Sequence, residues 1–268
     1  MTIPFTKAHG AGNDFVLTWA ADSPPADLAE TARAICDRHT GVGADGWLLV
    51  RAAPATESDA AIRLFNADGS EPELSGNGTR CAAAFLLDMG VVKGDQMRIA
   101  TGAGVKHLRL VEHEGRRFTF EMNMGRPAYA PAELRLELPL DGGMREVVAL
   151  SVGNPQCVVF VENFDLDWRR LGAEIERYPH FPNRTNVSFV RPVDAHTLEV
   201  RFFERGVGET MSSGTGSTGA MAAAILRGVA ESPVRVLTPA GPIDLRWDSD
   251  IYLTGPAAIV AAGEFYTN

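Results

Sequence analysis

The sequence predicts an α+β protein built from two copies of one structural unit. Residues 63–79 and 201–217 align at an offset of 138 positions, about half of the 268-residue chain. The offset places Ser75 on Ser213, and an alanine-rich apolar run follows each serine. A single S-G-x-G motif is a weak signal, but two copies in the same strand–loop–helix context indicate an internal duplication.

The first half reads as short strands with two helices. One helix is expected from Asp27, a preferred N-cap residue, to residue 38. The other follows the Ser75 loop to about residue 89, where Gly90 suits the left-handed conformation of a helix end. G-x-G-x-x-G at residues 41–46 precedes a strand, the reverse of the order in a dinucleotide site, so we discount it. The expected strands are residues 3–8, 15–19, 47–51, 60–66, 97–100, 105–111 and 117–122.

The second half repeats this arrangement after a linker expected near residues 114–116. Helices are expected at residues 171–178 and from the Ser213 loop to about residue 227. Gly153-Asn154, at the end of a strand, resembles Gly12-Asn13 in the first half. The expected strands are residues 147–152, 157–161, 186–190 and 198–203.

Composition narrows the classes of function. The formal net charge of −9 disfavours nucleic acid and anionic membrane surfaces as partners. We see no signal peptide and no run of 18 apolar residues, so we expect a cytoplasmic protein. Cys36, Cys81 and Cys157 fit neither a disulfide framework nor a metal site, so buried, reduced thiols are expected and no metal is predicted.

The two glycine-rich loops are suited to binding an anion. A loop that opens a helix presents free backbone N–H groups, and the helix dipole favours negative charge there. Taken alone, Ser75 and Ser213 are most simply helix N-caps. No G-K-[ST] follows either loop, which argues against a nucleotide P-loop. Two such loops facing each other would hold a carboxylate between them and present one side chain to each face of the substrate, as a two-base racemase requires.

Motifs along nearly the whole chain resemble those of the diaminopimelate epimerase family. They are HGAGNDF at residues 9–15, FNADGSEPE at 65–73, GNGTRCAAAF at 76–85, GNPQCVV at 153–159 and ERGVGETMSSGTG at 204–216. The resemblance implies a cofactor-free enzyme that interconverts LL- and meso-diaminopimelate in lysine and peptidoglycan biosynthesis. It also implies a homodimer whose subunit has two pseudo-symmetric domains, each a curved mixed or antiparallel sheet around a central helix.

The resemblance also assigns domains and substrate contacts. The first domain is expected at residues 1–116, completed by 258–268, the second at 117–257, and the active site in the cleft between them. The reacting carboxylate is expected on the backbone N–H groups of Gly76, Asn77, Gly214 and Thr215. Amide and guanidinium groups suit the second, distal amino-acid end of the substrate. The residues matched to the family's substrate-binding positions are Asn13, Asn66, Asn154, Asn186, Glu204 and Arg205.

The chain departs from the family on the reacting side of the site. The two catalytic positions, which are cysteines in the family, are Ser75 and Ser213 here, and Cys81 occupies a non-catalytic position. The family's glutamine and histidine are replaced by Gly46 and Gln156. A hydroxyl ionises roughly 7 pH units above a thiol, which corresponds to about 10 kcal/mol for forming the base. The motif offers no neighbouring base to compensate, so we expect weak or absent activity.

Two further functions remain open from the sequence. The chain could be a paralogue that acts on another amino acid as a racemase, dehydratase or isomerase. It could also bind an amino acid without catalysis.

Overall fold

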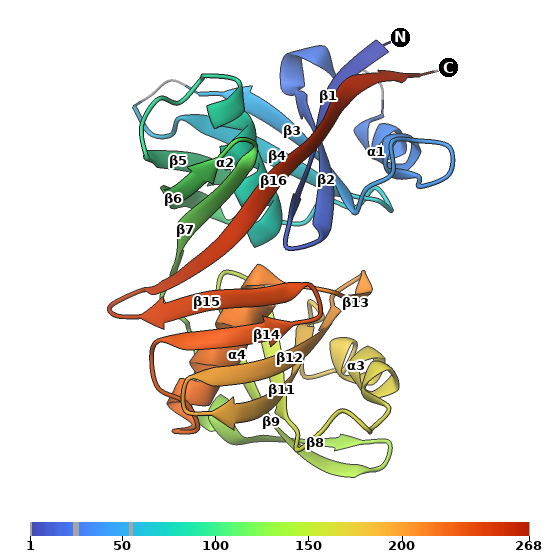
Figure 1. The fold of residues 1–268 in the computed structure, drawn as a ribbon. Coiled ribbons are helices and arrows are strands. Elements are labelled where there is room, and N and C mark those ends of the chain that lie inside the picture. Colours follow the sequence, from blue (N-terminus) through green and yellow to red (C-terminus); the bar gives the residue numbers. More distant parts are fainter. Residues whose placement is uncertain (1, 24–26, 54–55, 268) are drawn as a thin grey trace. The chain divides into compact units, whose positions relative to one another are not determined.

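The computed structural model describes residues 2–23, 27–53 and 56–267. The chain divides into two compact units, one comprising the residues up to Met122 and from Gly255 onward, the other Asn123–Thr254 (Figure 1). No helix in these described ranges is both long and apolar enough to cross a lipid bilayer.

The prediction of a linker near residues 114–116 is wrong, because these residues form a hairpin turn. β6 (Gly104–Glu114) and β7 (Arg117–Gly125) pair antiparallel with Glu114 opposite Arg117. Gly115 makes the turn between them with a φ of +58°. Glycine among charged residues suits a tight turn as well as a linker, and the first unit continues past this hairpin to Met122. The unit boundaries therefore lie at 122/123 and 254/255, against the expected 116/117 and 257/258.

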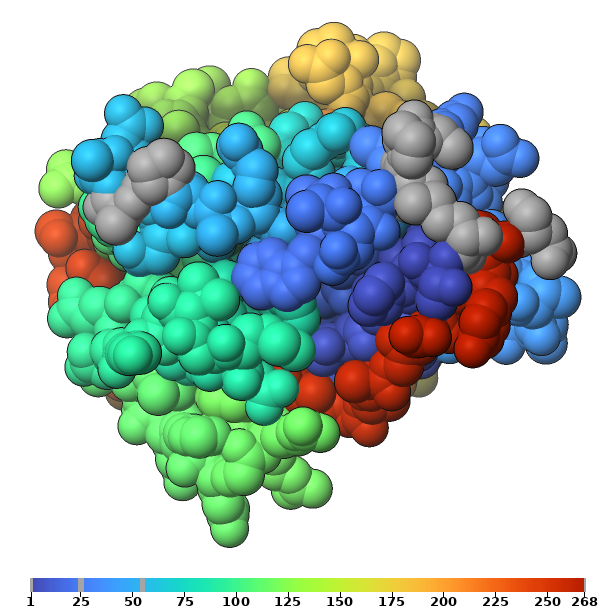
Figure 2. Space-filling model, turned by 90° about the horizontal axis from the view of Figure 1, so that it is seen from above, coloured from blue at the N-terminus to red at the C-terminus, as the bar shows by residue number. Residues whose placement is uncertain are grey.

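The first unit is a sheet closed around helix α2 (Gly76–Asp88). The strand order is β1-β2-β3-β4-β5-β6-β7-β16, and β16 also pairs with β1. Figure 2 shows this last contact, with the C-terminal segment in red beside β1 in dark blue. The remaining strands are β1 (Thr2–Gly10), β2 (Asn13–Trp19), β3 (Gly46–Ala52), β4 (Ala60–Asn66), β5 (Gln96–Thr101) and β16 (Ile251–Tyr266).

Helix α2 is buried over most of its length, as expected for a helix whose middle turns are alanine and other apolar residues. All of its residues from Gly76 to Leu86 are buried, and it packs against β1 to β5. Gly90 ends it with a φ of +69°, as expected. The outer helix α1 (Leu28–Cys36) starts at Asp27, whose side chain accepts the N–H groups of Ala29 and Glu30. It ends two residues before the expected residue 38 because Asp37 is already extended. A single 3₁₀ turn, η1 (Ala20–Asp22), follows β2.

The second unit arranges its sheet around helix α4 (Gly214–Leu226). The strand order is β16-β15-β14-β12-β11-β10-β9-β8, with β13 paired to β12. Outer helix α3 (Trp168–Glu176) starts three residues before the expected position because Asp167 caps it. The other elements are η2 (Pro131–Arg135), β8 (Leu136–Leu140), β9 (Gly143–Ser151), β10 (Pro155–Phe160), β11 (Asn186–Asp194), β12 (Thr197–Glu204), β13 (Gly208–Thr210), β14 (Val234–Thr238) and β15 (Gly241–Trp247).

The pairing directions repeat between the units. From β1 to β7, successive neighbours are antiparallel, parallel, antiparallel, parallel, antiparallel and antiparallel. The series β9-β10-β11-β12-β14-β15-β16 has the same order of directions. In each series a helix precedes the third strand and another follows the fourth. The predicted fold class, two pseudo-symmetric α+β units each built around a central helix, is confirmed.

Candidate active site

Ser75 is the N-cap of α2. Its backbone is extended, and its Oγ accepts the N–H of Gly78 at 3.1 Å. The N–H groups of Gly76 and Asn77 have no acceptor among the described residues of this unit, because the first N–H groups of a helix lack an intrahelical partner. Both residues are buried, while Ser75 itself is half-buried. The start of α2 therefore has the two free donors expected for a carboxylate.

Ser213 caps α4 in the same way but has an additional partner. Its Oγ accepts the N–H of Gly216 at 3.0 Å and donates to Oε1 of Glu204 at 2.6 Å. The side chain is buried, with 3% of its surface exposed. The sequence-based expectation of no neighbouring base is wrong for this serine. The family resemblance assigns Glu204 to substrate contact, and the motif does not show that Glu204 reaches from the end of β12 to the start of α4.

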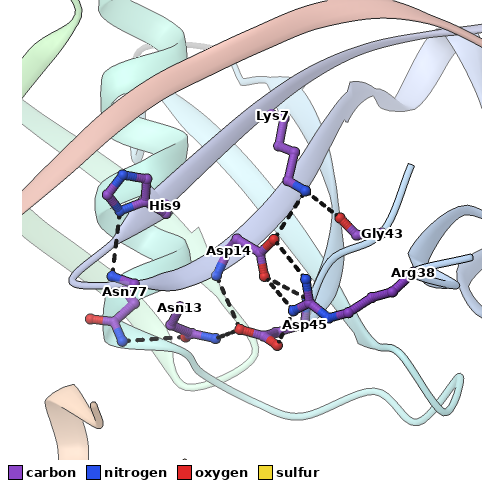
Figure 3. Close-up of polar contacts among 9 residues, drawn as sticks. Lys7, His9, Asn13, Asp14, Arg38, Gly43, Asp45 and Asn77 are labelled. Carbon is purple, nitrogen blue, oxygen red and sulfur yellow. Dashed lines mark hydrogen bonds and ion pairs between the residues drawn. The ribbon is translucent and has the colours of Figure 1, made fainter. Parts of the chain in front are cut away.

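Asn13 and Asn77 belong to one hydrogen-bonded chain in the first unit (Figure 3). Asn77 Nδ2 donates to Asn13 Oδ1 at 3.2 Å, and Asn13 Nδ2 donates to Asp45 Oδ2 at 2.6 Å. The β1–β2 hairpin turns through Ala11 and Gly12, both with positive φ, which brings Asn13 to this position.

Charged side chains continue this chain away from the helix. Arg38 donates to both Asp14 and Asp45, and Lys7 forms an ion pair with Asp14 at 3.1 Å. Burial opposes ionisation of Asp14, but the Arg38 and Lys7 contacts prevail and lower the pKa of its carboxyl. Asp45 therefore lies in an ordered ion cluster that fixes the orientation of Asn13.

Arg80 is a fully buried cation one turn inside α2. Its guanidinium donates to the carbonyl oxygens of Gly76 (3.3 Å) and Pro256 (3.1 Å) and to Asn77 Oδ1 (2.5 Å). Burial lowers its pKa to about 10, so it is charged at neutral pH. Within the described part of this unit it forms no ion pair with a carboxylate. Sequence reasoning did not identify Arg80 as a site residue. The signal that could have found it is its place in the GNGTRC motif.

The second unit holds the counterparts of these amides. Asn154 Nδ2 donates to Thr215 Oγ1 at 3.4 Å, and Gln156 Nε2 donates to Asn154 Oδ1 at 2.7 Å. Thr215 is the 138-residue equivalent of Asn77, so in each unit a Gly-Asn turn contacts the second residue after the serine. Gln156 is 1% exposed, and its Oε1 has no hydrogen-bond partner among the residues described.

Asn186 and Arg205 lie together, fixed by a glutamate that the sequence analysis did not identify. Asn186 Oδ1 accepts the N–H of Arg205 at 3.0 Å. Glu176 Oε1 accepts the N–H of Gly206 at 2.9 Å and a bond from Arg184 at 2.8 Å. Although burial opposes ionisation of Glu176, its bonds to Gly206, Arg177 and Arg184 lower the pKa of the carboxyl. Its position at the end of an amphipathic helix gave no signal of this role.

Asn66 is separate from these clusters. Its Nδ2 donates to Ser70 Oγ at 3.0 Å, within the turn that follows β4. The structure therefore joins Asn13 with Asn77, Asn154 with Thr215, and Asn186 with Arg205, while Asn66 stays within its own turn.

Gly46 has no room for a side chain. A Cβ there would lie 2.9 Å from Phe65 O and 3.2 Å from Phe15 Cδ1. The three cysteines are buried, as expected, and burial raises the pKa of Cys36 and Cys81 to about 12 and that of Cys157 further. None of these thiols therefore supplies a thiolate at neutral pH.

Comparison with known proteins identifies the family of the chain. The family model described as diaminopimelate epimerase matches residues 5–130 and 148–260. The chain is 40% identical to the diaminopimelate epimerase of Pelotomaculum thermopropionicum, covering 97% of this chain and 98% of that protein. It is also 40% identical to the diaminopimelate epimerase of Aromatoleum aromaticum, covering 98% and 99%.

Solved structures share the fold at lower identity. A probable proline racemase from Agrobacterium radiobacter superposes with a TM-score of 0.78 at 17% identity, covering 97% of this chain and 92% of that one. A phenazine biosynthesis protein of the PhzF family from Bacillus anthracis has a TM-score of 0.73 at 20% identity, covering 98% and 99%. The family model and the curated relatives identify the chain as an isomerase of the amino-acid epimerase class, as predicted. Within that class, the chain belongs to the diaminopimelate epimerase family.

Proposed function

We propose that this protein interconverts LL- and meso-diaminopimelate, a step of lysine biosynthesis, with Ser75 and Ser213 as the two acid–base groups. The observation that carries the proposal is the pair of equivalent helix starts, each with a capping serine and first-turn N–H groups that have no acceptor among the described residues of their own unit. In this proposal the two loops act on one substrate, whose reacting carboxylate accepts from Gly76, Asn77, Gly214 and Thr215. Its distal amino-acid end is bound by the amides and by Arg205.

Glu204 allows Ser213 to act without forming a free alkoxide. As Ser213 Oγ takes the α-proton of the substrate, its own hydroxyl proton passes to the Glu204 carboxylate, which leaves a neutral acid and a substrate carbanion. The reverse transfer returns a proton. A carboxylate is a weaker base than a thiolate by roughly 4 pH units, or about 6 kcal/mol, but it is fully ionised at neutral pH. We therefore propose slow catalysis on this side.

Ser75 is in a different environment. Its Oγ accepts from Gly78, and no carboxylate hydrogen bond to it occurs within the described residues of the first unit. The proposed activity is consequently unequal for the two stereoisomers: removal of the proton that faces Ser213 is faster than the transfer at Ser75 that completes inversion.

A second function is favoured by the departures at Gly46 and Gln156. The unpartnered Gln156 Oε1 is an acceptor where the family resemblance implies a titrating histidine. Such a site would suit a different amino acid, whose ammonium group donates to this oxygen. In this alternative the protein is still an amino-acid isomerase, but its substrate is another amino acid. Substrate screening distinguishes the two proposals.

The test is proton NMR of the protein with LL- or meso-diaminopimelate in deuterated buffer. We expect loss of an α-proton signal that is faster than the appearance of the other isomer. Turnover of another amino acid with no exchange of diaminopimelate would support the alternative. Tight binding in calorimetry without exchange of any amino acid would instead support a binding protein.

The homodimer implied by the family resemblance is part of this proposal. Analytical ultracentrifugation of the 28.8 kDa chain distinguishes a dimer from a monomer.

A further inference from the structure

One of the equivalent positions that differ between the two helix starts carries a charge in the first unit only. Arg80 in α2 corresponds to Thr218 in α4 at the 138-residue offset. Both side chains donate to the carbonyl of the residue that follows the serine: Arg80 to Gly76 O at 3.3 Å and Thr218 to Gly214 O at 2.8 Å. A buried cation in the first unit thus replaces a neutral hydroxyl in the second.

The hydrogen bond from Arg80 to the Gly76 carbonyl affects a predicted substrate contact, the N–H group of Asn77. The Gly76 carbonyl and the Asn77 N–H belong to one peptide group and point in opposite directions. A cation on the carbonyl oxygen polarises the group and strengthens its N–H as a donor, because linked hydrogen bonds reinforce one another. Arg80 also fixes the Asn77 side chain at 2.5 Å.

The electrostatic arrangement is incomplete without an anion. A guanidinium with no exposed surface lies at the positive end of the α2 dipole, and its hydrogen-bond acceptors in the described part of this unit are neutral oxygens. A buried charge ordinarily has a counter-charge. A carboxylate on the free N–H groups of Gly76 and Asn77 would supply one.

We propose that Arg80 is a positioning residue that makes the α2 loop the stronger carboxylate-binding loop of the two. The inference rests on the proposed function in identifying the anion as the reacting carboxylate. Arg80 does not touch the substrate; it acts through the Gly76–Asn77 peptide group and the Asn77 side chain. Gly255 makes room for it, since a Cβ there would lie 3.0 Å from Arg80 Cζ.

Acetate provides a probe that does not depend on the identity of the substrate. Amide NMR signals of Gly76 and Asn77, and of Gly214 and Thr215, are followed as acetate is added to the whole protein. In the wild type we expect the α2 signals to respond at roughly tenfold lower acetate than the α4 signals, the effect of one charge-assisted contact. Equal responses of the two loops would overturn the inference.

Variants separate charge from structure. Arg80→Met should abolish the difference between the loops, Arg80→Lys should retain part of it, and the matched Thr218→Val should leave the α2 response unchanged. An unchanged α2 response in Arg80→Met would contradict the inference. If Arg80→Met does not fold, Gly255→Ala displaces the guanidinium without removing its charge and should weaken the α2 response.

Calorimetry with diaminopimelate then tests the proposed function separately. An acetate response of the α2 loop without diaminopimelate binding would refute the substrate and retain the role of Arg80. Diaminopimelate binding that is equally strong in wild type and in folded Arg80→Met would refute the role of Arg80 and retain the substrate.

Discussion

Ser213 Oγ donates a 2.6 Å hydrogen bond to Glu204 Oε1, and the equivalent Ser75 has no such bond among the described residues of its unit. If Glu204 receives the proton that Ser213 relays, Glu204→Gln should slow α-proton exchange by about 10²-fold or more, the usual contribution of a general base. Exchange is measured by NMR in deuterated buffer. Glu209→Gln, which removes a partly exposed glutamate paired with Arg169, is the matched control and should leave exchange unchanged. Equal exchange in wild type and Glu204→Gln would exclude the relay.

Replacing both capping serines by cysteine should raise epimerisation. The thiol ionises near pH 8.5, far below a hydroxyl, so Ser75→Cys/Ser213→Cys should gain about 10²- to 10⁴-fold in rate. Formation of meso-diaminopimelate from the LL isomer is measured by chromatography. Ser212→Cys places a thiol at the neighbouring buried serine and should give no gain. A double variant no faster than wild type would reject the acid–base assignment of these two positions.

Glu176 should contribute to stability in a pH-dependent way. Its carboxyl has a folded-state pKa below the ordinary 4.5, so its contribution is present above about pH 4.5 and is lost as the pH falls through the folded-state pKa. Glu176→Gln should lower the free energy of unfolding by about 2–4 kcal/mol at pH 7, because two arginines and the Gly206 N–H lose a charged partner.

Urea unfolding at pH 7 and in acid tests this expectation. The difference between Glu176→Gln and wild type should shrink in acid, and the exposed glutamate variant Glu137→Gln should show no loss at either pH. A loss of the same size at both pH values would mean that Glu176 acts through packing rather than charge. Weaker amino-acid binding by folded Glu176→Gln would also be expected, since the same carboxylate anchors the loop that carries Arg205.

Gly46 should tolerate no side chain. Gly46→Ala places a Cβ against Phe65 O, a methyl group of Leu64 and the ring of Phe15, and should lower the free energy of unfolding by about 1–3 kcal/mol. Thermal or urea unfolding gives the value. Gly94→Ala is the control, because its Cβ would have no neighbour closer than 3.9 Å. If Gly46→Ala is as stable as wild type, β3 and β4 can shift more readily than their packing indicates.

The sequence was most informative where local chemistry decides the structure. Asp27, Ser75 and Ser213 are short polar residues before apolar runs, and each caps a helix as predicted. The strand expected at residues 60–66 is β4 at the same bounds, because its alternating pattern is flanked by turn residues on both sides.

Prediction failed where contacts between residues far apart in the sequence determine the structure. Arg80 has the sequence appearance of an exposed helical charge; it is buried because β16, whose Pro256 accepts its bond, closes over it from 176 positions away. Glu204 carried a substrate-binding assignment, and its contact with Ser213 depends on how β12 returns to the start of α4. Composition does not distinguish the hairpin at Gly115 from the unit boundary at Met122. The two places differ in the long-range strand pairing of the residues around them.

The pairing of β16 with β1 determines the order in which the two units can finish folding during synthesis on the ribosome. The second unit is one continuous segment, Asn123–Thr254, and all of its partners within the unit precede its end. The first unit contains residues from Gly255 onward, of which Ala258 to Tyr266 pair with Thr2 to His9. Because domains fold as their segments emerge, β1 must wait for β16, which is synthesised later. The unit that begins the chain is therefore completed after the unit that follows it, and during translation its β1 edge stays open to chaperones or to mispairing with another nascent chain.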